Sequence, residues 1–318
     1  MSENDWLSHF LQLITVTGQL EVRCTYSGPW RVAWSQTAAH EIPYHIVLNG
    51  RAVLEDLQTQ VTRELAGGDI VLLPHGSAHV LHDGSGRAPA PNRNRRGAAG
   101  WMVSANDGED APLELLCGRL FVEHPHGQIL RDYLPANLVV RAMSSHEEKA
   151  NGLASSRLAS LVSLMRIEAA GEKPGGSLIL NAFSSALFTL ALRTASESGQ
   201  APPGLSSLVG DPRLTPAISA MFADPAHAWT LSELAGLCGV SRDTFIRHFH
   251  DKLGRSAVGL LADIRMSLAA NRLKNTAMSA AEVAGSVGYR SLVAFRRVFT
   301  GRIGMTPMQW RRLAHEAG

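Results

Sequence analysis

The first part of the chain alternates short apolar runs with turn-forming residues, a pattern typical of β structure. Runs such as EVRCTY, WRVAW, YHIVL and DIVLLP are separated by Gly, Pro, Asn and Asp. Many short strands at this spacing favour a sandwich or a small barrel. We therefore predict a β domain over residues 1–144. Within it, residues 83–100 are rich in Gly, Pro, Asn and Arg, which predicts a disordered or mobile loop.

Near residue 145 the apolar positions change from the period of strands to that of helices. Two helices are predicted over residues 145–197, separated by GEKPGG, and the second is apolar on nearly all sides. Polar residues interrupt the second helix, which favours a buried or intersubunit helix over a membrane span. Residues 198–210 contain two prolines among small polar residues and indicate a linker. Residues 211–318 follow a helical pattern throughout.

Two stretches of this helical part, residues 230–254 and 279–304, follow one plan. Each begins with a polar N-cap residue and a Glu three positions later, which is the spacing of a capping box. Each continues through a short helix and a glycine turn to a second helix that carries Phe and Arg. The residues at the cap, the Glu and the turn are Thr230, Glu233 and Gly239, then Ser279, Glu282 and Gly288. Two helix-turn-helix motifs are predicted.

Residues 211–318 resemble the DNA-binding domain of AraC/XylS transcription regulators. The second stretch carries the family's signature residues in order, namely Gly288, Tyr289, Phe295, Arg296, Gly304, Thr306, Pro307, Trp310 and Arg311. The resemblance implies two DNA-reading helices whose first turns face the major groove. The candidate DNA contacts are Arg242, Asp243, Thr244 and Arg247 in the first helix, and Ser291, Val293, Ala294, Arg296 and Arg297 in the second. Phe245, Phe249, Phe295 and Phe299 are expected in the core, and Arg265 is expected to be structural.

The charge distribution agrees with a nucleic-acid partner for this part. The formal net charge of the whole chain is only +2, yet residues 211–318 contain 14 Lys and Arg against 8 Asp and Glu. A basic helical part on a mildly acidic β part favours a polyanion as partner. The N-terminus has acidic residues before its apolar stretch, which does not fit a secretory signal.

In the β part, the spacing of Gly68, Pro74, Gly76, His79 and Asp83 resembles the second motif of the cupin barrel. In enzymatic cupins this histidine joins a His-x-His and a carboxylate from a first motif to hold a metal. The His-x-His is missing here, so no cofactor is expected, and the histidines are predicted to line a ligand pocket. The predicted pocket residues are His45, His75 and His79. The alternative is a metal held by His45 and His79, with help from His75 or His82.

The chain has three cysteines, Cys24, Cys117 and Cys238, and no CxxC pair. This count excludes a disulfide scaffold and fits a reducing cytoplasm. Cys24 and Cys117 lie in strand-like segments, where two interpretations stay open. They are small buried hydrophobic residues, or they are redox-active thiols of a sensor. Cys238 is expected to serve packing.

The resemblances together imply an α+β protein of two domains. An N-terminal cupin-like sensor domain (1–144) is followed by a helical dimerisation or support segment (145–197), a linker (198–210) and an all-α double helix-turn-helix domain (211–318). The expected function is a cytoplasmic, homodimeric transcription activator that binds double-stranded promoter DNA and acts with RNA polymerase. Its effector is expected to be a small molecule or an oxidant, with no enzyme activity and no membrane partner. The alternative is a metal-dependent cupin enzyme that carries a DNA-binding tail.

Overall fold

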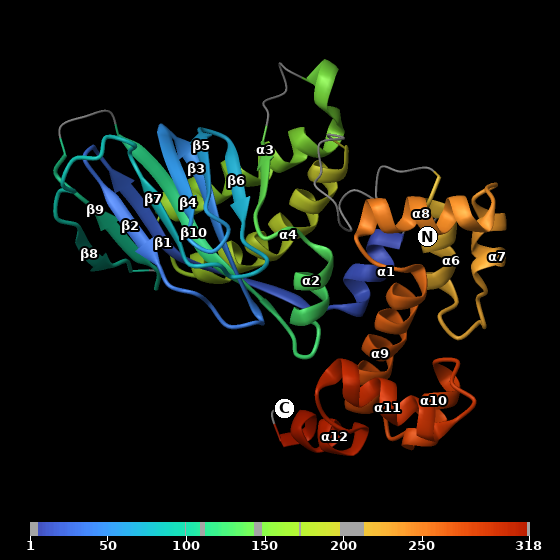
Figure 1. Cartoon of the computed structure of the whole chain (residues 1–318). Helices are drawn as coiled ribbons and strands as arrows, with labels where there is room; N and C mark the ends of the chain where they lie inside the picture. Colours follow the sequence, from blue (N-terminus) through green and yellow to red (C-terminus); the bar gives the residue numbers. More distant parts are fainter. Residues whose placement is uncertain are drawn as a thin grey trace. The chain divides into compact units, whose positions relative to one another are not determined.

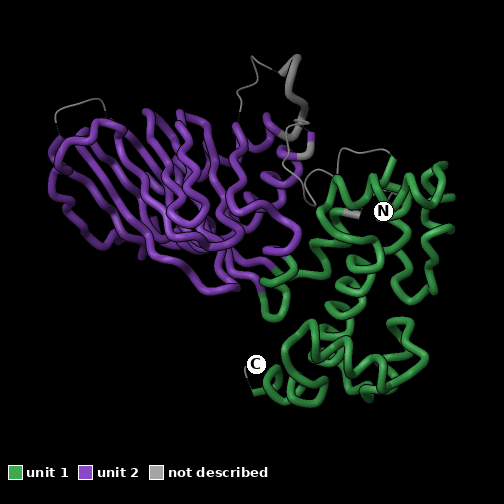
Figure 2. Tube along the Cα trace, in the orientation of Figure 1, with its two compact units in different colours: residues 1–15, 123–129, 203–318 green, residues 16–122, 130–202 purple. Residues whose placement is uncertain are grey.

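The computed structural model describes residues 6–98, 100–108, 112–142, 148–171, 173–197 and 213–316. The chain forms two compact units (Figure 2). The β unit comprises residues 16–122 and 130–202. The helical unit comprises residues 1–15, 123–129 and 203–318. Residues 1–15 and 123–129 lie well before the predicted linker, and they nevertheless belong to the helical unit.

The β unit contains two sheets (Figure 1). The strand order is β11-β6-β3-β10-β1-β9-β8 in the seven-stranded sheet and β2-β7-β4-β5 in the four-stranded sheet. The strands are β1 (Val16–Tyr26), β2 (Arg31–Trp34), β3 (Glu41–Asn49), β4 (Arg51–Asp56), β5 (Val61–Ala66), β6 (Asp69–Leu72), β7 (His79–His82), β8 (Arg93–Arg96), β9 (Met102–Ala105), β10 (Leu113–Val122) and β11 (Leu138–Arg141).

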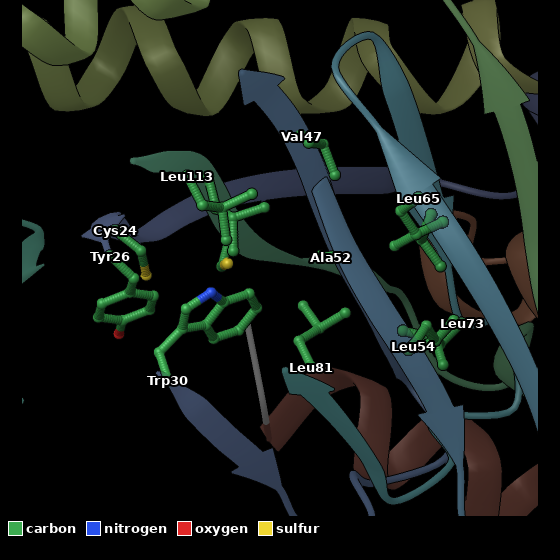
Figure 3. Close-up of a cluster of buried hydrophobic side chains, with 13 residues drawn as sticks. Cys24, Tyr26, Trp30, Val47, Ala52, Leu54, Leu65, Leu73, Leu81 and Leu113 are labelled. Carbon is green, nitrogen blue, oxygen red and sulfur yellow. The ribbon is translucent and has the colours of Figure 1, made fainter. Parts of the chain in front are cut away.

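A hydrophobic core is built from inward-facing residues of both sheets, because successive side chains of a strand point to opposite faces. Figure 3 shows part of it, with Trp30, Leu54, Leu81 and Leu113 from four different segments. Pro74 and Gly76 form the turn before β7, and Gly76 has φ +62°, which favours glycine. The predicted sheet-rich, cupin-like N-terminal fold is confirmed.

The predicted mobile loop over residues 83–100 needs a correction. Residues 93–96 form strand β8, which pairs antiparallel with β9 at the edge of the larger sheet. All four β8 residues are exposed. Pairing at a sheet edge uses backbone groups and needs no apolar side chain, so the polar sequence RNRR gave no strand signal.

Helices α3 (Glu148–Gly171) and α4 (Gly176–Glu197) pack against each other, and α4 lies on β1. By length and composition alone, α4 is a helix that can cross a membrane. The polar residues that interrupt it bond to the sheet. The Ser184 hydroxyl is 2.7 Å from the Tyr44 hydroxyl, and the Asn181 side-chain oxygen accepts from the Leu20 backbone N–H. These contacts attach α4 to the larger sheet of the β unit.

The helical unit contains α1 and the helices of the DNA-binding part. They are α1 (Trp6–Leu13), α6 (Thr215–Ala223), α7 (Leu231–Leu237), α8 (Arg242–Leu253), α9 (Ala257–Asn275), α10 (Ala280–Ser286), α11 (Leu292–Ile303) and α12 (Pro307–Glu316). Helix α2 (Gly127–Tyr133) begins in the helical unit and ends in the β unit. Phe10 of α1 meets Phe222 of α6 edge to face.

The segment 123–129 is also bonded to α9. The His126 ring nitrogen Nε2 donates to the Asn271 side-chain oxygen at 2.9 Å, and the Asn271 amide donates to the Leu13 carbonyl at 2.8 Å. Glu123 pairs with Lys274. Asn271 therefore links α9 to the two chain segments that border strands β1 and β10.

Glycine 288 is expected to be essential for the stability of the helical unit. Its φ is +83°, and an added Cβ would lie 2.4 Å from the Ala226 carbonyl oxygen. A positive φ costs an L-residue roughly 1–2 kcal/mol, and the backbone clash adds to this. We expect Gly288→Ala to lower the free energy of unfolding by about 2–4 kcal/mol, measured by thermal and denaturant unfolding.

Gly285 provides a matched control in the same motif. It lies inside α10, and nothing stands within 4 Å of an added Cβ. Gly285→Ala should stabilise the chain by about 0.5–1 kcal/mol, because alanine loses less backbone entropy in a helix. Equal stability of the two variants would contradict the role given to the turn at Gly288.

Candidate DNA-binding surface and sensor core

The two predicted motifs have the capping and turn geometry that their sequences indicate. Thr230 and Ser279 each form a complete capping box, with Glu233 and Glu282 respectively. The turn glycines Gly239 and Gly288 both have positive φ. These short-range features bring α8 and α11 to the second position of each motif, which is the position of the DNA-reading helix.

Some candidate DNA contacts are exposed side chains, and others take part in capping the N-termini of α8 and α11. Six of the nine candidate side chains lie exposed within α8 and α11, namely Arg242, Asp243, Arg247, Val293, Arg296 and Arg297. The Ser291 hydroxyl accepts from the Ala294 backbone N–H, so this serine caps α11. The Thr244 hydroxyl bonds to the Ser241 cap at 2.9 Å. As DNA contacts, all nine residues remain predictions.

The four phenylalanines and the arginine that the sequence predicts to be structural make contacts within the helical unit. Phe245 and Phe249 form one buried ring pair, and Phe295 and Phe299 form the equivalent pair in the second motif. The Arg265 guanidinium donates to the carbonyls of Pro225 and His227, at 2.7 Å in each case. It thereby fixes the turn before α7 to α9.

The interior of the β unit brings together residues that are far apart in the sequence. His45 on β3 lies opposite Cys117 on β10, and the His45 nitrogen Nδ1 is 3.1 Å from the Cys117 sulfur. The other ring nitrogen of His45, Nε2, is 2.7 Å from Nε2 of His79. Trp34 stacks on the His79 ring at 5.2 Å between centroids. All of these groups except Trp34 are fully buried.

The hydrogen-bond partners show which ring nitrogens of His45 and His79 carry protons. His79 Nδ1 is 2.7 Å from the Ser77 carbonyl oxygen, which only accepts, so Nδ1 carries a proton. Burial lowers the pKa of His79, and burial together with His79 lowers the pKa of His45 well below its ordinary value. Two neutral imidazoles follow. His79 Nε2 then accepts from His45 Nε2–H, which leaves His45 Nδ1 as an acceptor beside the Cys117 sulfur.

Cys24 and Cys117 lie in one buried core cluster, and each thiol shifts the pKa of the other. The Cys117 thiol lowers the pKa of Cys24 against the opposing effect of burial. The Cys24 thiol, followed by burial, raises the pKa of Cys117 well above its ordinary value. Because a thiolate is the reactive form of cysteine, Cys24 is the more nucleophilic of the two. Figure 3 shows the Cys24 sulfur in the core beside Tyr26.

A cavity of about 310 Å³ leads to this cluster. His45 and Cys117 lie among its lining residues, with Trp34 and Pro43 as apolar lining. Arg119 also lines it, and its guanidinium is paired with the carboxylates of Glu21 and Glu41. The lining is thus polar where Arg119 stands and apolar around Trp34.

Two of the three predicted pocket histidines lie outside this cavity, and their role in a ligand pocket stays a prediction. His75 does not line this cavity, because its ring nitrogen donates to the Leu134 carbonyl at 3.0 Å. His79 does not line it either, because it lies against the His45 ring and Trp34. Of the three predicted pocket histidines, only His45 borders the cavity.

The metal alternative stays a prediction, and the following contacts describe the residues that it names. In the ranges that the structure describes, no three His, Cys, Asp or Glu side chains come together as a metal site. His45 and His79 meet, but each ring bonds the other directly. His82, proposed as a helper, faces Glu55 at 3.3 Å. A stable site needs three or four preorganised ligands.

Sequence reasoning did not single out Trp34, Arg119, Glu21 or Glu41. Trp34 and Arg119 lie in the strands RVAW and LELLCGRLFV, which show no strict polar and apolar alternation, so the direction of these side chains depends on the strand register. A register cannot be fixed from one sequence, and no short motif marks these residues.

The comparisons with known proteins agree with this arrangement. The Cupin family model matches residues 5–197, and a helix-turn-helix domain model matches residues 234–313. An uncharacterised HTH-type transcriptional regulator of Haemophilus influenzae is 27% identical, over 97% of this chain and 98% of its own length. The RCS-specific HTH-type transcriptional activator RclR of Escherichia coli is also 27% identical, over 96% and 97%. The HTH-type transcriptional regulator MtrA of Neisseria gonorrhoeae is 29% identical, over 97% and 98%.

Solved structures with some similarity include the AdpA DNA-binding domain in complex with a target DNA, at 29% identity. It covers 34% of this chain and 96% of that one, with a TM-score of 0.32. ToxT from Vibrio cholerae is 13% identical, covers 94% of both chains and has a TM-score of 0.36.

The cupin match covers more than half of the chain, and the helix-turn-helix match follows it in order. The relatives of similar length are named as transcription regulators, not as enzymes. The chain therefore belongs to the AraC/XylS family of DNA-binding transcription regulators, in the branch with an N-terminal cupin domain.

Proposed function

We propose that this regulator is an activator whose cupin domain responds to two-electron oxidants through Cys24 and Cys117. The observation that carries the proposal is the placement of the two cysteines as diagonal neighbours on β1 and β10 in one buried core cluster, with His45 3.1 Å from the Cys117 sulfur. The cavity bordered by Cys117 gives a small oxidant a route to the pair. One relative is named as an RCS-specific transcriptional activator, and the word activator supports the proposed direction of the effect.

The chemistry is a two-step disulfide formation. The Cys24 thiolate attacks the terminal oxygen of a hydroperoxide, so an S–O bond forms, the O–O bond breaks, and the leaving alkoxide takes up a proton. The Cys117 sulfur then attacks the Cys24 sulfenic acid, the S–O bond breaks, and water leaves with the thiol proton. The two thiols lose two electrons and the hydroperoxide gains them. His45 Nδ1 is placed to take up the Cys117 proton and pass it to the leaving hydroxide, which departs as water.

The proposed disulfide would act on two particular strands. Cys24 pairs with Leu115 across β1 and β10, so Cys117 is its diagonal neighbour. Diagonal neighbours are farther apart than a disulfide allows, so the bond would shift β1 against β10. The pairing ends at Val16 and Val122, and the chain continues from there into Thr15 and Glu123 of the helical unit. We propose that the shift reaches α9 through these segments and Asn271.

We further propose a cytoplasmic homodimer that contacts RNA polymerase at its promoter. Large apolar side chains stand exposed on α3 and α4, with Ile167 69% exposed and Leu178 75% exposed. Such side chains favour an interface between two copies. Sedimentation at micromolar concentration should show a dimer, and Leu178→Asp should give a monomer. A monomeric wild-type protein would remove this part of the proposal.

A small molecule in the cavity is the second candidate signal. The space of about 310 Å³ beside Trp34 and the Arg119 ion pairs fits a small amphipathic ligand. In that case the cysteines would be packing residues, and oxidant would leave DNA binding unchanged.

A footprint on the DNA upstream of the protein's own gene and its neighbours tests the proposal. We expect a salt-sensitive footprint that a mild hydroperoxide changes and a dithiol reductant restores. A footprint that is indifferent to oxidant would keep the regulator and favour the small-molecule signal. If these sites give no footprint, a genome-wide binding selection decides whether the chain binds DNA specifically.

A further inference from the structure

The two helix-turn-helix motifs are built on one framework, so α8 and α11 can be compared position by position. Ser241 and Ser291 are the N-caps, and Gly254 and Gly304 are the left-handed C-caps. The buried pair Phe245 and Phe249 recurs as Phe295 and Phe299. All of these pairs share an offset of 50 residues, so the exposed residues between them occupy equivalent places.

At the positions that are exposed in both helices, the two motifs share an arginine and otherwise differ. Two of these differences concern apolar and ionised residues. Arg247 corresponds to Arg297, a basic residue in both motifs. Asp243 corresponds to Val293, and Ile246 corresponds to Arg296. The apolar and the ionised residue have therefore exchanged places between the motifs. The shared arginine fits a phosphate contact, which positions without specifying, and the exchanged pair fits sequence reading.

Val293 is an apolar side chain that the core of its motif does not use. It lies on the first turn of α11 and is 78% exposed, whereas the core of this motif is filled by Phe295, Phe299 and their neighbours. Ile246 of α8 is 38% exposed. In the major groove the one apolar group on a base edge is the 5-methyl of thymine. An apolar side chain in the major groove is therefore expected to contact a thymine methyl.

We propose that Val293 reads a thymine methyl in the half-site of the second motif, and that Ile246 reads one in the half-site of the first. The proposal rests on the proposed placement of α8 and α11 in the major groove. Arg296 lies three residues after Val293, on the same exposed face of α11. The second half-site is then expected to contain a thymine next to the base pair that Arg296 contacts.

The test uses deoxyuridine, which differs from thymidine only by the missing methyl. The preferred duplex is first selected from a random pool with the full-length protein. Each thymine is then replaced by deoxyuridine, one at a time. We expect one replacement in each half-site to weaken wild-type binding about three- to tenfold, the size of one lost methyl contact. Replacement at thymines outside these two places should change the affinity little.

Variants assign each thymine to its reader. Val293→Ser should bind the thymine and uracil forms of the second half-site equally. In the first half-site this variant should still bind the uracil form more weakly than the thymine form. Ile246→Ser should show the opposite pattern. Both side chains are exposed, so neither variant disturbs the core. Val61→Ser, at an exposed valine of the β unit, is the matched control and should keep both penalties.

Two results would overturn the inference. One is a wild-type protein that is insensitive to uracil at every thymine of the second half-site. The other is a Val293→Ser variant that keeps the full penalty there. The placement of α11 is tested separately by Arg296→Ala. If that variant binds the selected duplex as tightly as wild type, the placement itself is wrong, and the base assignment is overturned with it.

Discussion

Raising the salt concentration from 50 to 200 mM should weaken specific DNA binding by about 10³–10⁵-fold. Residues 211–318 carry 14 Lys and Arg against 8 Asp and Glu, and two reading helices present exposed arginines. Each neutralised phosphate releases counterions, so the affinity falls linearly on a logarithmic scale with salt. Filter binding or anisotropy over this range measures the slope. A shallow slope would contradict the placement of both helices on DNA.

Two neighbouring arginines of α11 should separate the specific from the electrostatic part of this binding. Arg296→Ala should cost about 1–3 kcal/mol at one base pair and relax the preference there, because a bidentate contact to guanine is lost. Arg297→Ala should weaken binding to all sequences alike and reduce the salt slope by about one phosphate contact. If both variants changed specificity equally, Arg297 would also be a base contact.

The sequence predicted the helical unit in detail because its signals are short-range. A capping box joins residues three positions apart, and a turn glycine is needed where φ is positive. Ser241, Ser291 and the four buried phenylalanines follow from the same local pattern. Two adjacent copies of one motif strengthened each assignment, since each copy tested the other.

The sensor core was much less predictable, because its contacts join distant residues through strand register. His45 meets Cys117, 72 residues later, only because β3 and β10 pair in one particular register. A shift of one residue would turn each side chain to the other face of the sheet. Likewise, the bond between His126 and Asn271 spans 145 residues. Nothing in the local sequence of residues 123–129 indicates that they belong to the helical unit.

The cysteine variants are expected to have the largest effect on the response to oxidant. Cys24→Ala and Cys117→Ala should each abolish the oxidant-induced change of the footprint and of promoter output, since either change removes one half of the proposed disulfide. Cys238→Ala is the matched control, because this cysteine caps α7 in the helical unit, and it should respond like wild type. Under oxidant, intact-mass measurement should show the loss of two hydrogens in wild type and in Cys238→Ala only.

The pH dependence of oxidation distinguishes an active thiol pair from two packing residues. The Cys117 thiol lowers the pKa of Cys24, so wild-type Cys24 carries more thiolate at neutral pH than an ordinary buried thiol. Cys117→Ala removes that thiol and leaves burial, which raises the pKa of Cys24. The rate of Cys24 sulfenic acid formation should then fall at neutral pH and recover as the pH rises. An unchanged pH profile, or an intact oxidant response in Cys24→Ala, would contradict the thiol sensor and direct attention to the cavity beside Trp34.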